Sequence, residues 1–107
     1  MNDLIRHFIH YGIHFALPPL IAWIWYRRSF KTAALILLSG IILDIDHLWA
    51  NPVFDTGRCS IGFHTLHQWP FIALYILLFG IKQTRIAGLA LLIHILADTA
   101  DCLLMDF

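Results

Sequence analysis

Residues 86–105 of this chain read IAGLALLIHILADTADCLLM. An α-helix of 20 such residues is about 30 Å long, which matches the hydrocarbon thickness of a bilayer. Within the stretch, His94, Asp98 and Asp101 are spaced four and three residues apart, so a helix places them on one face. The stretch therefore predicts a membrane-spanning helix that carries a single polar stripe.

Three more apolar runs lie upstream, and each is long enough to cross a bilayer. Pro18-Pro19 is expected to kink the first run, and Asn51-Pro52 to end the second. Short connections between successive helices favour antiparallel neighbours. We therefore predict an all-α fold, a single transmembrane domain over residues 1–107 built as an antiparallel up-down bundle of four helices. The expected helices cover residues 4–26, 32–50, 63–81 and 86–105.

The composition excludes an ordinary soluble domain of this size. Of the 107 residues, 60% are hydrophobic and 13% are charged, and the mean hydropathy is +0.75, whereas soluble domains are about a quarter charged. A small soluble fold could not bury so much apolar surface. The formal net charge is zero, and no basic tract indicates nucleic-acid binding. The expected partner is the lipid bilayer, and the oligomeric state stays open.

The basic residues predict how the bundle is oriented in the membrane. Five of them fall in the loops after the first and third helices, and two fall on the opposite side. Because basic residues concentrate on the cytoplasmic side, both termini and the 51–62 connector are expected outside the cytoplasm. The predicted location is the inner (plasma) membrane, crossed several times. The five are Arg27, Arg28, Lys31, Lys82 and Arg85, and the two are Arg6 and Arg58.

The two cysteines, Cys59 and Cys102, do not form a CxxC motif, which argues against a thioredoxin-type site or a zinc knuckle. One interpretation is a pair of buried, inert thiols. The other is a disulfide, which requires both residues to face an oxidising compartment.

The histidines and three of the aspartates fall on one side of the predicted bundle. In an up-down arrangement, the start of the first helix, the end of the second, the start of the third and the end of the fourth share that side. A charged side chain within a membrane costs about 2.5–3.5 kcal/mol on insertion scales and usually serves a function. No lysine or arginine lies at comparable depth to pair with Asp44, Asp46 or Asp98, so a divalent cation is the expected partner.

Mixed histidine and aspartate ligation favours Zn, Mn or Fe(II). The candidates exceed what one four-coordinate ion needs, which leaves one ion or two ions with a bridging carboxylate open. A buried polar network between helices is the alternative without metal. His10 is a borderline ligand, whereas His7 and Asp101 are expected near the surface. The predicted ligands are His14, Asp44, His47, His64, His67, His94 and Asp98.

Asp46 differs from these ligands in helical phase. On an ideal α-helix it points away from the face shared by Asp44 and His47, unless the helix unwinds there. We predict that Asp46 is the catalytic proton-transfer residue, because such a group need not bind the metal. A bridging or ligand-orienting role is the alternative.

Four short blocks resemble a known family. Residues 43–47 (LDIDH) resemble the DxDH signature of the small, LexA-regulated, inner-membrane predicted metal-dependent hydrolases, and residues 94–99 (HILADT) are similar to their closing HxxxD[ST] motif. Residues 62–67 (GFHTLH) resemble the central histidine pair, with a tighter spacing than the family's HRxxTH pattern, and His14 resembles the N-terminal histidine. The blocks occur in the family's order. The resemblance implies metal chemistry.

These observations together predict a membrane-embedded, metal-dependent hydrolase that acts on a lipid-borne substrate, with a lipid phosphate or related headgroup preferred. A non-catalytic metal-binding or metal-transport protein is the first alternative, although the apolar inner half of the helices argues against transport. A haem-binding membrane protein is the second, and the aspartates argue against it because carboxylates are not usual axial ligands.

Overall fold

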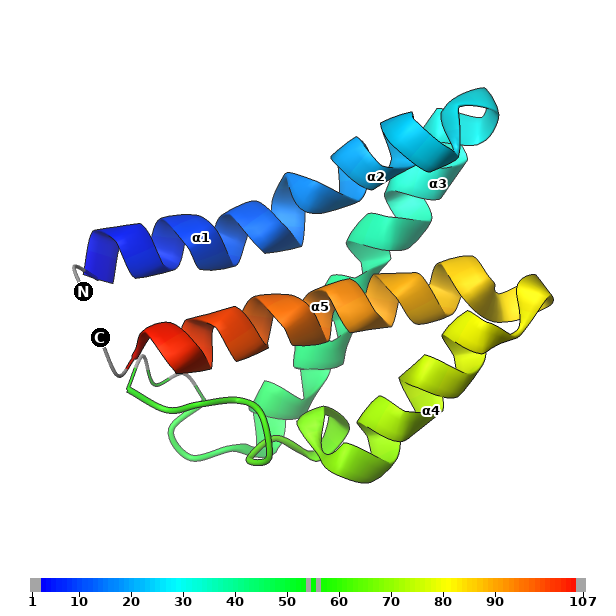
Figure 1. The fold of residues 1–107 in the computed structure, drawn as a ribbon. Coiled ribbons are helices and arrows are strands. Elements are labelled where there is room, and N and C mark those ends of the chain that lie inside the picture. Colours follow the sequence, from blue (N-terminus) through cyan, green and yellow to red (C-terminus); the bar gives the residue numbers. More distant parts are fainter. Residues whose placement is uncertain (1–2, 54, 56, 106–107) are drawn as a thin grey trace.

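The computed structural model describes residues 3–53, 55 and 57–105, which form an all-α fold without strands in those ranges. In Figure 1, α5 lies between α1–α2 on one side and α4 on the other, and the segment that begins as α3 passes behind α5. The helices are α1 (Asp3–Phe15), α2 (Leu17–Trp25), α3 (Phe30–Leu38), α4 (Trp69–Gly80) and α5 (Arg85–Leu104). The 3₁₀ segments are η1 (Arg27–Ser29), η2 (Ser39–Trp49), η3 (Thr65–His67) and η4 (Lys82–Thr84).

Three helical segments are long and apolar enough to cross a membrane: Asp3–Trp25, Arg27–Trp49 and Lys82–Leu104, each of 23 residues. The apolar helix α4 has 12 residues and is about 18 Å long, which is too short to span alone. The described residues therefore form four helical segments, three spans and α4, and the chain is a multi-pass helical membrane protein, which confirms the predicted fold class. The first span bends where α1 ends and α2 begins, one residue before Pro18-Pro19.

The second span changes from α-helix to 3₁₀-helix at Ser39, and its burial pattern follows the new period. Three residues per turn place Gly40, Leu43 and Asp46 on one buried stripe. A Cβ atom on Gly40 would collide with the backbone carbonyl of Ala90, so glycine permits η2 to lie against α5. Runs of 3₁₀-helix longer than three or four residues are uncommon, and this one has 11. The unwinding turns Asp46 inward.

The third helix begins at Trp69, six residues later than the sequence predicts. Gly62 has a φ of 82°, and His64 and Gln68 are extended, so the chain before Trp69 cannot continue a helix. Pro70 then lies in the first turn of α4, where its missing N–H costs nothing. The residues expected to open a helix instead form the end of the connector between Trp49 and Trp69, which contains η3.

The connector reaches deep into the protein. His67 Nε2 lies 3.1 Å from Nε2 of His94, and His94 is the tenth of the 20 residues of α5. The irregular backbone around η3 therefore lies close to the middle of a membrane span. Such backbone is tolerated at that depth where protein surrounds it. The side chain of Asp46 accepts a hydrogen bond from the Leu66 N–H at 2.8 Å, and Tyr75 Oη donates to the Leu66 carbonyl at 2.8 Å. These bonds hold the η3 turn in place.

A disulfide joins Cys59 of the connector to Cys102 of α5, with the Cα atoms 5.0 Å apart. Of the two interpretations of the cysteines, the structure shows the disulfide. Near this bridge, Arg6 of α1 pairs with Asp101 of α5 at 3.0 Å. The start of α1, the connector and the end of α5 therefore share one end of the molecule, as Figure 1 shows.

Candidate metal centre

The histidine and aspartate side chains gather in three clusters, each with ligand atoms within 4.8 Å of one another. Each of the seven predicted ligands belongs to at least one cluster, and His10 and Asp46 are the two further members. We name them the inner cluster, the α1 cluster and the cavity cluster. The inner cluster is Asp44, His67, His94 and Asp98, the α1 cluster is His10, His14 and Asp98, and the cavity cluster is Asp46, His47 and His64.

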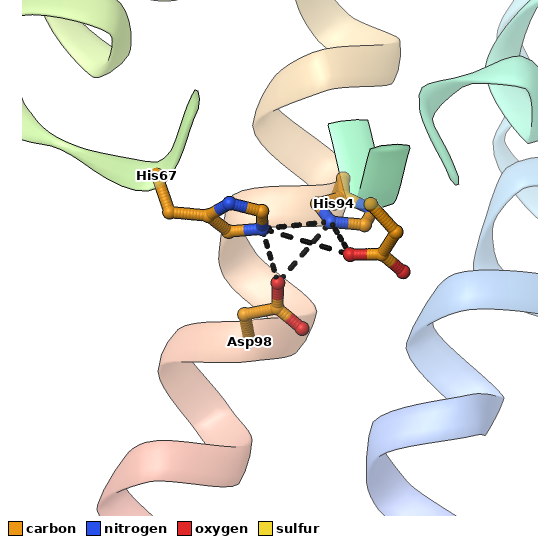
Figure 2. A group of neighbouring side chains, drawn as sticks. His67, His94 and Asp98 are labelled. Atoms are coloured by element: carbon orange, nitrogen blue, oxygen red, sulfur yellow. Dashed lines mark hydrogen bonds and ion pairs between the residues drawn. The ribbon is translucent and has the colours of Figure 1, made fainter. Parts of the chain in front are cut away.

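The inner cluster has the dimensions of a tetrahedral metal site. His67 Nε2 lies 2.8 Å from Asp98 Oδ2 and 3.1 Å from His94 Nε2, and Figure 2 shows these three side chains converging. Asp44 Oδ1 lies 3.0 Å from His94 Nε2 and 3.7 Å from His67 Nε2. Four ligands about 2.0–2.1 Å from a zinc ion lie about 3.3–3.4 Å apart at tetrahedral angles. The observed separations bracket that value.

Asp46 fixes the orientation of His67. Its Oδ2 lies 2.8 Å from His67 Nδ1, and both side chains are fully buried. When Nδ1–H donates to this carboxylate, the lone pair of Nε2 points at Asp98, as in carboxylate–histidine–metal arrangements. Burial lowers the pKa of His67, but its contacts with Asp98 and Asp46 raise that pKa above the ordinary value. The position facing Asp98 therefore suits either a proton or a metal ion.

The α1 cluster uses the other oxygen of the same carboxylate. Asp98 Oδ1 lies 2.8 Å from His10 Nε2 and 3.3 Å from His14 Nε2, and these two nitrogens are 3.0 Å apart. Asp98 Oδ2 faces the inner cluster at the same time. Asp98 therefore lies between two sets of ligand atoms, and one carboxylate could bridge two ions.

The cavity cluster lies around the second oxygen of Asp46. Asp46 Oδ1 is 3.3 Å from His47 Nδ1 and 3.9 Å from His64 Nδ1. The rings of His47 and His64 stack with their centroids 3.8 Å apart. His64 lies outside the three spans, and burial together with the neighbouring His47 lowers its pKa below the ordinary value. A neutral imidazole is the form that binds metal.

A cavity of about 230 Å³ lies over two of the clusters. Its walls come from α1, the end of η2, the connector and α5, and they include His10, His47 and His64. Arg6 and Arg58 also line the cavity. Arg58 donates to the carbonyls of Pro52 and Val53 at 2.9 and 3.0 Å, so its guanidinium group is held against the backbone of the connector. Because His10, His47 and His64 line this cavity, the α1 and cavity clusters both face it.

The sequence predicts ligands around one centre, and the structure divides them among three clusters. His10 was only a borderline candidate, although its spacing of four residues from His14 is the signal that both face one partner. His7 lines the cavity and belongs to none of the three clusters. Asp101 pairs with Arg6.

The family of this chain follows from its similarity to known proteins. Neither a curated protein nor a solved structure matches the chain. One family model matches residues 4–105, a range that contains all three clusters and every helix apart from the first residue of α1. That family is described as one of unknown function, DUF6122. With nearly its whole length matched, the chain belongs to the family DUF6122.

Proposed function

We propose that this chain is a membrane-embedded, metal-dependent hydrolase acting on a lipid phosphate or related headgroup. The observation that carries the proposal is the position of Asp98, whose two oxygens each lie within 2.8–3.3 Å of two histidine nitrogens. Two divalent ions would be held there, one by the inner cluster and one by the α1 cluster. The resemblance to predicted metal-dependent hydrolases supports the same conclusion.

The donor atoms favour zinc, manganese or iron(II). Both cysteines are joined in the disulfide, so the three clusters offer only imidazole nitrogens and carboxylate oxygens. When bound, such an ion polarises a phosphoryl oxygen and lowers the pKa of water. The chain's own part is to fix the ligands in advance, and the hydrogen bond from His67 to Asp46 does this for the inner cluster.

Charge favours a phosphate over a neutral ester as the substrate. With neutral histidines the clusters carry three carboxylates, and two divalent ions leave one net positive charge. An anionic phosphate oxygen would compensate that charge, and the low dielectric constant of the membrane interior would strengthen their attraction. The cavity adds two arginines, Arg6 and Arg58, and balances them with Asp55 and Asp101. A lipid headgroup is the form in which a phosphate would reach this depth.

A non-catalytic metal-binding protein is the second candidate function. The specific observation in its favour is that the inner cluster offers four ligands and that none of them lines the cavity. A closed set of four ligands is typical of structural metal sites.

The test begins with the chain purified in detergent. We expect bound zinc, manganese or iron by elemental analysis, together with hydrolysis in a panel of lipid phosphates, phosphodiesters and neutral lipid esters. Chelation should abolish the activity, and readdition of the ion should restore it. Hydrolysis of neutral esters alone would contradict the substrate class. A fully loaded protein that hydrolyses nothing in the panel would favour the second candidate.

A further inference from the structure

We propose that the cavity cluster holds a metal ion of its own, separate from the ions at Asp98, with an open coordination position facing the cavity. The ion is of the same divalent, zinc-like class. This proposal rests on the proposed function in one respect: the open position would receive an anionic oxygen of the phosphate substrate.

The first support is the buried carboxylate oxygen at the centre of this cluster. Asp46 is fully buried, and its Oδ1 accepts no hydrogen bond within the described part of the chain. Burying a charged oxygen without a hydrogen bond is unfavourable, so a cation is the natural complement. His47 and His64 each direct a ring nitrogen toward this oxygen, at 3.3 and 3.9 Å.

The orientation of His47 is compatible with ligation. Its Nδ1 lies 3.1 Å from the backbone carbonyl oxygen of Asp44. A carbonyl oxygen only accepts, so Nδ1–H donates to it and Nε2 is left as the ligand atom. His64 is 3% exposed and stacks on the same ring, so both imidazoles are held beside Asp46 before any ion binds.

The second support is that this cluster shares no residue with the other two. Asp46 nevertheless contacts the inner cluster, because its Oδ2 lies 2.8 Å from His67 Nδ1. Its two oxygens therefore have different partners, His67 on one side and the cavity histidines on the other. As a ligand through Oδ1, Asp46 would not be the proton-transfer residue predicted from the sequence.

The third support is the route from solvent. His47 and His64 both line the cavity of about 230 Å³. Three protein ligands leave a fourth tetrahedral position free, which is typical of catalytic rather than structural zinc sites. A third divalent ion would raise the net charge of the three clusters to three positive charges, which strengthens the preference for phosphate. Arg58 lines the same cavity.

Metal content of the full chain in detergent tests the proposal without reference to activity. After zinc loading and removal of free ion, we expect three ions per chain in the wild type and two in His64→Ala. His7→Ala is the matched control, because His7 lines the same cavity outside the clusters, and it should retain three. An unchanged content in His64→Ala would overturn the proposal. A wild-type content of two that falls to one in His64→Ala would keep this site and refute the pair of ions at Asp98.

A second variant guards against a folding defect. If His64→Ala does not elute as a single species with its disulfide formed, His47→Ala takes its place with the same expectation. Cobalt loading gives an independent readout, since inorganic phosphate should shift the visible absorption of wild type and His7→Ala but not of His64→Ala. An equal shift in His64→Ala would assign the open position to another ion. Three ions without hydrolysis would leave this site standing and refute the proposed function.

Discussion

Two regions supply ligands to the inner cluster, and they differ in regularity. Helix α5 is a continuous α-helix of 20 residues, and it places His94 and Asp98 one turn apart on its buried face. The segment from η2 to η3 is a long 3₁₀-helix followed by an irregular connector that ends in a single 3₁₀ turn, and it places Asp44 and His67 opposite them. The regular region provides the carboxylate of Asp98, which lies between two clusters, and the irregular region decides which histidines meet which aspartate.

The sharpest test of this division is Asp98→Ala on the regular side. We expect the variant to lose both ions at Asp98 and all hydrolysis, because each of its oxygens serves a different cluster. Zinc content should fall from three ions per chain to one, measured by elemental analysis. Asp101→Ala is the matched control one turn further along α5, and it should retain the wild-type content. Full occupancy in Asp98→Ala would refute the bridging assignment.

On the irregular side, Asp46→Asn should have a smaller effect. The amide oxygen can still accept the hydrogen bonds from His67 and Leu66, but the amide nitrogen cannot ligate an ion. We expect the loss of one ion of three, together with most of the hydrolysis. Occupancy and turnover should be measured on one sample. If all three ions remain and turnover is lost, Asp46 is the proton-transfer residue that the sequence predicts.

The contact between the two regions can be loosened without touching a ligand. Gly40→Ala places a methyl group against the Ala90 carbonyl, and overpacking of this kind costs about 1–3 kcal/mol. We expect lower thermal stability in detergent and weaker zinc binding, since η2 must move away from α5. Gly12→Ala, where a Cβ would meet nothing within 4 Å, should be neutral or stabilising by about 0.5–1 kcal/mol. Equal behaviour of the two variants would contradict the close approach.

The disulfide should affect the rate of metal exchange more than the amount of metal bound. It anchors the connector, which carries His64 and His67, to the end of α5. In the double variant Cys59→Ser and Cys102→Ser, we expect unchanged zinc content and a faster release to a chelator, by about threefold or more, because the anchored loop gains freedom. The release rate can be followed with a chromogenic chelator. An unchanged rate would show that hydrogen bonds alone hold the connector.

The smallest perturbation tests where the two regions lie in the cell. A disulfide at the end shared by α1 and the connector fits an oxidising compartment, which agrees with the prediction that both termini are outside the cytoplasm. In intact cells, an impermeant maleimide should label Asp3→Cys and not Gln83→Cys. The opposite labelling would reverse the predicted orientation and leave the metal predictions unchanged.

The two regions differ in how much of their structure can be predicted from the sequence. The α5 stripe follows from spacing alone, because a regular helix converts spacing into direction. Asp46 could not be placed in the same way, since a change from 3.6 to 3.0 residues per turn at Ser39 alters every direction after it. Likewise, the start of α4 at Trp69 depends on the extended backbone of His64 and Gln68, and the local sequence signal for it is Pro70, a residue favoured in the first turn of a helix. The division of one expected centre into three clusters arises in these irregular segments.

The shortness of α4 has a consequence for the surrounding lipid. A helix of 12 residues covers about 18 Å of a hydrocarbon layer about 30 Å thick, and lipids adapt to such hydrophobic mismatch by local thinning. Trp69 at the start of α4 is 72% exposed, and Trp49, 63% exposed, donates to Thr65 Oγ1 at 3.1 Å. Tryptophans of this kind mark the headgroup level. Beside α4, phospholipid headgroups are therefore expected to lie deeper than elsewhere in the bilayer, at the level of η3. A substrate headgroup would then reach the protein without leaving the bilayer, whereas a soluble enzyme would need to extract it.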